Sequence, residues 1–191
     1  MSEHLADPSY HDAMLGDQHD DPTYSIRPVQ DDDWPIVAAI FNHFVVNSPA
    51  AYPDRPVRPE FFREKQRALP ALPFVVVETD GRLVGFAYLS PVHPVATMRR
   101  SAQVTYFILP NHTGQGLGER LLDLLLDEGR AMGVDNFMAH VSSLNEGSIR
   151  FHTRHGFTEC GRFRRIGTKN GEDFDMVWLQ RLEPVDGEGP R

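Results

Sequence analysis

The sequence predicts an α/β fold in which a mixed central sheet carries helices on both faces, and two patterns support this. In the first half, residues 74–78 and 83–89 are apolar runs joined by the turn Asp80-Gly81, which is typical of an antiparallel hairpin. In the second half, extended runs alternate with amphipathic helical patterns, which is typical of parallel strands joined by helices. A sheet that combines both patterns is mixed.

The helices are predicted from apolar residues at three- and four-residue spacing. Trp34, Val37 and Phe41 begin the first such stripe, and three aspartates precede it, where they favour the positive end of the helix dipole. The expected helices cover residues 34–45, 61–69, 117–132 and 145–155. The strands expected besides the hairpin cover residues 24–28, 102–109, 137–142, 159–165 and 173–182.

The distribution of charge predicts one domain between two tails. The 191 residues include 27 acidic and 19 basic side chains, for a formal net charge of -8. Residues 1–21 hold six carboxylates, no lysine or arginine and no apolar periodicity, so we expect a disordered acidic tail at 1–23. Residues 184–191 predict a flexible C-terminal tail. The domain is expected at 24–183, where the two signs of charge nearly balance.

The composition argues against several classes of protein. No apolar run approaches the roughly 20 residues of a helical membrane span, and the first residues lack the pattern of a signal peptide. The lone Cys160 cannot form an internal disulfide, so we expect a cytoplasmic protein in which this cysteine packs as a small apolar side chain. Because no basic patch is evident, we expect neither a nucleic-acid nor a membrane partner.

Three closely spaced glycines mark the most informative loop. Gly114, Gly116 and Gly118 lie where a strand ends and a helix begins, so backbone N–H groups can converge there on an anionic phosphate. A glycine-rich turn without a ligand is the alternative. A Walker loop is excluded because no Gly-Lys-Ser/Thr follows, and the preceding hairpin is the wrong context for a dinucleotide fingerprint.

A second motif follows, in which Asn145 and Ser148 begin a helix that ends at Gly156-Phe157. Together the two motifs resemble the GNAT N-acetyltransferases, whose signature is a Gln/Arg-x-x-Gly-x-Gly/Ala loop and then an Asn-x-x-Ser/Ala helix ending in Gly-Phe/Tyr. The resemblance covers residues 25–183 and implies the GNAT fold. It is greatest to the phosphinothricin and methionine sulfone acetyltransferase branch, through residues 41–44, 85–88, 161–163 and 173–178.

The resemblance implies acetyl-CoA as cosubstrate and no metal. The main chain of the glycine loop would bind the pyrophosphate, and a strand edge would pair with the pantetheine arm like an added strand. The implied cofactor-binding residues are Tyr106, Phe107, Ile108, Thr113, Gly114, Gln115, Gly116, Leu117, Gly118, Glu119, Asn145 and Ser148. Thr113 departs from the family pattern, because it stands where the family has Gln or Arg.

The expected catalytic residues are Gln103 and His152. An alkyl amine is protonated at neutral pH, with a pKa like the roughly 10.4 of lysine, so its proton must be removed. The branch has a glutamate for this role where this sequence has Gln103, whose amide cannot take up a proton. Ordered water near Gln103 or the imidazole of His152 could act instead. His152 also stands where many family members have a tyrosine that protonates the thiolate. A helix histidine without a function is the alternative.

The implied acceptor is the primary amine of a small molecule, an amino acid or an analogue, which attacks directly in a ternary complex. Arg99 matches an arginine of the branch and could bind a carboxylate, whereas His93 stands where relatives often have arginine. The expected substrate-binding residues are Phe41, Phe44, Tyr88, His93, Arg99, Gln103, Val104 and Thr105.

Three further expectations complete the interpretation. Gln103 leaves open a second class of function, a CoA-binding sensor that has lost catalysis. The family's frequent dimers imply a homodimer. His152 and His155 form a His-x-x-His pair, but no metal site is predicted because further ligands at recognisable spacing are lacking.

Overall fold

The computed structural model describes residues 23–184, which form one seven-stranded sheet in the order β1-β2-β3-β4-β5-β7-β6. The expected tails, 1–23 and 184–191, lie outside the described residues except for positions 23 and 184. The sheet is mixed, since β4 and β5 are parallel and the other neighbours are antiparallel. The predicted fold class is confirmed.

Each expected helix and strand is present, with small changes at its ends. The strands are β1 (Ser25–Pro28), β2 (Phe74–Thr79), β3 (Arg82–Pro91), β4 (Ser101–Ile108), β5 (Asn136–Ser142), β6 (Thr158–Lys169) and β7 (Glu172–Leu182). The helices are α1 (Trp34–Asn47), α2 (Glu60–Ala68), α3 (Leu117–Ala131) and α4 (Glu146–Arg154). Short 3-10 turns lie at η2 (Asp31–Asp33), η3 (Ala96–Met98) and η4 (Pro110–His112).

The two hairpin turns have the backbone that their residues favour. Asp80 and Gly81 join β2 to β3 with φ angles of 50° and 70°, and Asn170 and Gly171 join β6 to β7 with φ angles of 53° and 80°. Two consecutive positive φ angles match the right-handed twist of the flanking strands, and Asp-Gly and Asn-Gly adopt them readily. These turns fix the register of both hairpins.

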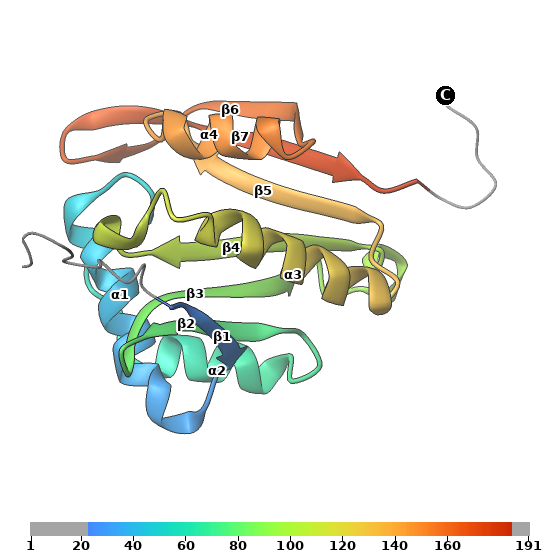
Figure 1. Ribbon diagram of the computed structural model, residues 1–191. Coiled ribbons are helices and arrows are strands. Elements are labelled where there is room, and N and C mark those ends of the chain that lie inside the picture. The colour runs from blue at the N-terminus through green and yellow to red at the C-terminus, as the bar shows by residue number, and fades with distance from the viewer. Residues whose placement is uncertain (1–22, 185–191) are drawn as a thin grey trace, which may run out of the picture.

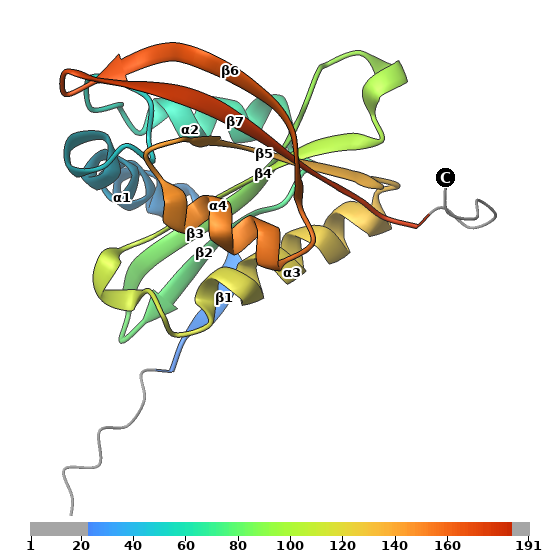
Figure 2. The same ribbon diagram turned by 90° about the horizontal axis from the view of Figure 1, so that it is seen from above.

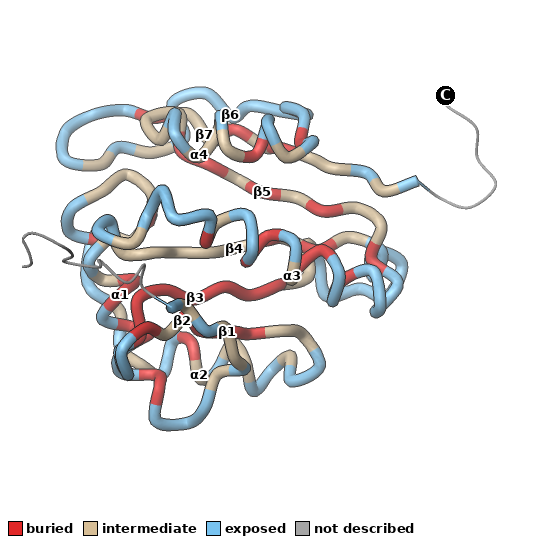
Figure 3. The backbone as a smooth tube through the Cα atoms, viewed as in Figure 1, coloured by how far each residue is buried: buried red, intermediate tan, exposed pale blue. Residues whose placement is uncertain are grey.

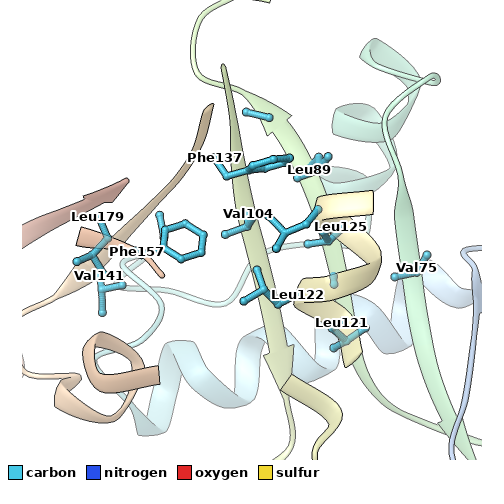
Figure 4. Packing of buried hydrophobic residues seen from close by; sticks show 14 of the residues in the cluster. Val75, Leu89, Val104, Leu121, Leu122, Leu125, Phe137, Val141, Phe157 and Leu179 are labelled. Atoms are coloured by element: carbon cyan, nitrogen blue, oxygen red, sulfur yellow. The ribbon is translucent and has the colours of Figure 1, made fainter. Parts of the chain in front are cut away.

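Helices cover the sheet on both faces, with α3 and α4 on one side and α1 and α2 on the other (Figures 1 and 2). Beneath α3, the fully buried Leu121, Leu125 and Phe137 belong to one core cluster (Figure 4). On the opposite face, Phe62 of α2 and Phe86 of β3 centre a second, aromatic cluster. Strands β2 and β3 are buried over most of their length and contribute to both clusters, so they form the buried middle of the sheet (Figure 3).

Strand β6 forms one edge of the sheet and is exposed over most of its length (Figure 3). Cys160 lies on this strand and is exposed, so the expectation that it packs as a buried apolar side chain is wrong. The physical reason is that β6 pairs only with β7, at the edge of the sheet. Phe163 and Ile166 on the same strand are 55% and 49% exposed.

A stability prediction concerns Gly129, where α3 packs closely on the sheet. A Cβ atom there would lie 2.5 Å from Cε1 and 2.7 Å from Cζ of the buried Phe137 ring. Gly129→Ala is expected to lower the free energy of unfolding by about 1 to 2 kcal/mol, because overpacking outweighs the better helix propensity of alanine. Urea denaturation measures the change.

Gly147→Ala in α4 is the matched control. Its Cβ would meet only Asn145 Oδ1, at 3.9 Å, so this variant should be as stable as the unmodified protein or slightly more so. Equal stability of the Gly129→Ala variant and the control would show that the core accommodates the methyl group.

Candidate active site

The site begins where β4 and β5 separate. Their parallel pairing covers Ser101–Gln103 against Asn136–Met138 and stops there within the described part of the chain. Strand β4 continues beside β3 as far as Ile108, and β5 continues beside β7 as far as Ser142, so the two strands diverge (Figure 1). The facing edges of residues 104–108 and 139–142 therefore have backbone groups available to a ligand.

A cleft of about 1050 Å³ opens at this separation. Both diverging strands line it, together with the glycine loop, helix α4 and aromatic side chains from α1 and α2. Most of the expected site residues lie on its wall: Phe41, Phe44, Tyr88, Gln103, Val104, Thr105, Tyr106, Phe107, Ile108, Thr113, Gly114, Gly116, Leu117, Gly118, Glu119, Asn145, Ser148 and His152. The fold thus gathers residues spread over more than half of the chain.

Three expected residues lie outside the wall of the cleft. His93 and Arg99 are exposed on the connection between β3 and β4. This connection lies at the opposite end of β4 from the glycine loop. The structure therefore does not bring these two side chains to the cleft. Gln115 is exposed between two lining glycines, on the glycine loop itself.

The glycine loop is shaped by its left-handed residues. Gly114 and Gly116 have φ angles of 78° and 73°, and a Cβ atom on either would point into open space. Gly116 is also the residue that caps α3, so the unpaired N–H groups of the first helical turn lie on the cleft wall. Gly118 lets α3 approach α4, since a Cβ there would lie 3.2 Å from the ring of Phe151. This geometry suits an anionic group.

Asn145 shapes the start of α4. Its Oδ1 accepts a hydrogen bond from the backbone N–H of Ser148 at 3.2 Å, which is the N-cap contact that the sequence predicts. Both residues lie on the wall of the cleft. The cap fixes the direction of the helix that carries His152 into the interior.

His152 is buried and forms a hydrogen-bonded chain with Tyr106. Its Nδ1 lies 2.8 Å from the carbonyl oxygen of Ser148, and its Nε2 lies 2.7 Å from the Tyr106 hydroxyl. A carbonyl oxygen can only accept, so Nδ1 holds the imidazole proton and Nε2 accepts from the tyrosine. Phe157 packs edge-on against the imidazole at 5.1 Å between ring centres.

Burial sets the protonation of both partners. It lowers the pKa of His152 below its ordinary value of 6.5, although the bond to Ser148 opposes the shift. It also raises the pKa of Tyr106 well above 10. At neutral pH the pair is therefore an uncharged imidazole and a protonated phenol, and both side chains lie on the wall of the cleft.

The opposite face of the sheet holds a second group of polar side chains. Lys65 of α2, Tyr52 of the loop after α1 and His140 of β5 all line the cleft, with Ser90 of β3 near Gln103. Lys65 Nζ lies 4.9 Å from the ring centre of Tyr88, in a cation–π contact. The sequence interpretation did not assign Lys65, His140 or Ser90 to the site, because no local motif connects them.

Between residues 23 and 184, no group of three or more His, Cys, Asp or Glu side chains could hold a metal ion. Over the same residues, none of the helices has the length and apolar character that a membrane crossing requires.

The chain belongs to the GNAT acetyltransferases. The family described as "Acetyltransferase (GNAT) family" matches residues 37–157, which include the glycine loop and the Asn145 helix. The chain is therefore an N-acetyltransferase, as its sequence predicts.

Similar proteins come from the branch that the sequence resembles. The chain is 31% identical to the L-amino acid N-acyltransferase MnaT of Escherichia coli K12, over 84% of this chain and 97% of that protein. It is 32% identical to a phosphinothricin N-acetyltransferase of Alcaligenes faecalis, over 82% of this chain and 81% of that protein. A phosphinothricin acetyltransferase from Sinorhizobium meliloti, solved in complex with acetyl-CoA, has a TM-score of 0.80 and 25% identity, covering 88% and 94% of the two chains.

The bond between Tyr106 and His152 generates a stability prediction. Tyr106→Phe leaves the buried Nε2 of His152 without its donor, so the free energy of unfolding should fall by about 1 to 3 kcal/mol. Urea denaturation at pH 7.5 measures this loss. In a double-mutant cycle, His152→Leu should lower the free energy of unfolding by less in the Tyr106→Phe background than in the unmodified protein. Strictly additive effects would mean that the two side chains are not coupled.

Proposed function

We propose that this protein transfers the acetyl group of acetyl-CoA to the primary amine of a small amino acid or a close analogue, by direct attack in a ternary complex. The observation that carries the proposal is the continuous cleft that opens between β4 and β5 and joins the glycine loop to an aromatic compartment. The glycine-loop end of the cleft offers backbone N–H donors for phosphates, and the aromatic end offers apolar side chains together with the ammonium group of Lys65. The relatives named for phosphinothricin and L-amino acids support this class of acceptor.

The cleft fits acetyl-CoA through its backbone. Gly114, Gly116 and the first turn of α3 would hold the pyrophosphate, and the open space beside both glycines leaves room for close approach. The free edge of β4 at residues 104–108 would pair with the amides of the pantetheine arm. When bound, acetyl-CoA supplies the acetyl group as a thioester. Thr113 already donates its hydroxyl to the Pro110 carbonyl, so its side chain serves the loop.

The Tyr106–His152 pair would supply a proton to the departing thiolate. The tyrosine hydroxyl is protonated at neutral pH and donates its proton to His152 Nε2. Rotation about its C–O bond would turn that proton toward a thiolate in the cleft. The imidazole holds the hydroxyl in place and exchanges protons with it. Both side chains lie on the α3 and α4 side of the sheet.

The aromatic compartment would select the acceptor. Phe41, Phe44 and Tyr88 provide its apolar surface, and Phe41 is also part of the buried aromatic cluster. Lys65 brings a positive charge to the wall of the cleft and could pair with the carboxylate of an amino acid. It therefore takes the role that the sequence interpretation gave to Arg99.

We further propose that the protein acts in the cytoplasm as a homodimer. Its lone cysteine is unpaired, which suits a reducing compartment. The exposed edge strand β6, with Phe163 and Ile166 on its surface, offers apolar area that a second copy could cover.

The direct test combines binding and turnover. Acetyl-CoA is expected to bind the full chain in a calorimetric titration, and free CoA thiol is then expected to appear with at least one amine from a panel of amino acids, phosphinothricin and methionine sulfone. Release of thiol should require the amine. Binding without release for any amine would instead support a CoA-binding sensor, and failure to bind would refute both functions.

His152→Ala tests the proposed proton donor pair. Turnover should fall about tenfold or more, while the dissociation constant of acetyl-CoA changes less, because the pair acts on the leaving group and the glycine loop holds the cofactor. Steady-state kinetics gives the turnover number, and calorimetry gives the dissociation constant of acetyl-CoA. An unchanged turnover number would remove His152 from the mechanism.

A further inference from the structure

The sheet separates the ionisable side chains of the cleft into two groups. Along β4, Ala102 and Val104 belong to the core beneath α3, and Tyr106 packs against the same core. Gln103 and Thr105 alternate with them and pair with Ser90 and Tyr88 of β3. Their side chains therefore point to the face covered by α1 and α2. The Tyr106–His152 pair therefore lies on one face, and the aromatic compartment lies on the other.

A proton acceptor for the amine must lie on the face of the aromatic compartment. Gln103, on that face, has an amide that cannot take up a proton. His152 is on the opposite face, and both of its ring nitrogens already have partners. On this face, His140 of β5 is the residue of the described sheet that brings an imidazole to the wall of the cleft.

His140 is held at this position by rings on two sides. It lies on β5 two residues after Met138, the parallel partner of Gln103, and neighbouring residues Ala139 and Val141 point into the α3 core. The ring of Tyr52 stacks on it at 5.5 Å, and the ring of Trp178 lies 5.1 Å away on the other strand neighbour, β7. His140 Nδ1 lies 3.4 Å from the Tyr52 hydroxyl.

The surroundings of His140 keep its imidazole neutral at pH 7. Lys65 of α2 is the cation that acts on it, and Tyr52 has a pKa raised to about 12 by burial. Trp178 of β7 is not ionisable. Burial, with the charge of Lys65 as a second cause, lowers the pKa of His140 below its ordinary 6.5. Above about pH 6.5 the imidazole is therefore free to accept a proton.

We propose that His140 is the general base of this enzyme and replaces the carboxylate that Gln103 lacks. The inference rests on the proposed function and deepens it, since it assigns a base to the same acetyl transfer. Tyr52 orients the imidazole: when Nδ1–H is donated to the tyrosine oxygen, the lone pair lies on Nε2. The proton goes there directly or through one water molecule.

The protons and bonds of this step balance. The ammonium group of the acceptor gives one proton to His140 and becomes a free amine. The amine nitrogen forms a C–N bond to the thioester carbon, the C–S bond breaks, and the electron pair leaves with sulfur. The nitrogen loses its second surplus proton as the amide forms, which matches the proton that the thiolate takes up. His140 returns its own proton to solvent, so one proton is released per turnover.

The test uses His140→Gln in the full chain, with the amine that supports most thiol release. At pH 7 we expect kcat/KM for the amine to fall roughly 100-fold or more, with acetyl-CoA affinity unchanged. The unmodified enzyme should show a rising limb in kcat/KM below about pH 6.5, and this limb should disappear in the variant. Gln103→Glu in the His140→Gln background should restore activity at least tenfold, because it places a carboxylate on the same face.

Two controls separate this role from a structural one. His43→Gln removes an exposed histidine of α1 outside the cleft and should leave kcat/KM unchanged. If His140→Gln fails to bind acetyl-CoA, His140→Asn is the second variant, and the rescue by Gln103→Glu is measured in it.

The outcomes distinguish the two proposals. The base role is refuted if kcat/KM of a His140 variant falls less than about threefold, or if its pH profile keeps the low-pH limb. The acetyltransferase activity would still stand. A loss confined to KM, with no rescue by Gln103→Glu, assigns His140 to binding and equally overturns the proposal. An unmodified enzyme that releases no thiol with any amine refutes the proposed function and the base role with it.

Discussion

The divergence of β4 and β5 after a three-residue parallel pairing is the constraint on which the site depends. Each strand keeps an antiparallel partner on its outer side, β3 for β4 and β7 for β5, so both stay extended as they separate. Their inner edges then carry backbone donors and acceptors that would be costly to bury without partners. A cleft at this place exposes them, and an amide-containing ligand such as a pantetheine arm can satisfy them.

The same divergence gives the buried His152 and the half-buried His140 different surroundings. His152 lies beneath α4, with a carbonyl at one nitrogen and the Tyr106 hydroxyl at the other. His140 lies on the far side of the sheet, between aromatic rings and near the charge of Lys65. Burial lowers the pKa of both, so both are neutral at pH 7, and their hydrogen-bond partners give them different chemistry.

Much of the fold and of the glycine-loop end of the cleft could be predicted from local sequence. The turns Asp80-Gly81 and Asn170-Gly171 fix two hairpins through their own backbone preferences, and apolar spacing placed all four helices to within a few residues. The glycine loop and the Asn145 cap could be predicted as well, because each is formed by residues close together in the sequence. His93 and Arg99 were placed with the substrate on a family pattern, yet their loop is exposed beyond the end of β3.

The sequence by itself determined the mixed sheet, the two motifs and the absence of a carboxylate at Gln103, since each depends on local periodicity or on a single side chain. Only the tertiary structure decided which polar side chains line the cleft on the face of α1 and α2. Lys65 and His140 come from a helix and a strand that are far apart in the sequence, and no spacing rule relates them. Likewise, only the edge position of β6 decided that Cys160 is exposed. Long-range packing brings these residues together, and single-sequence periodicity carries no information on it.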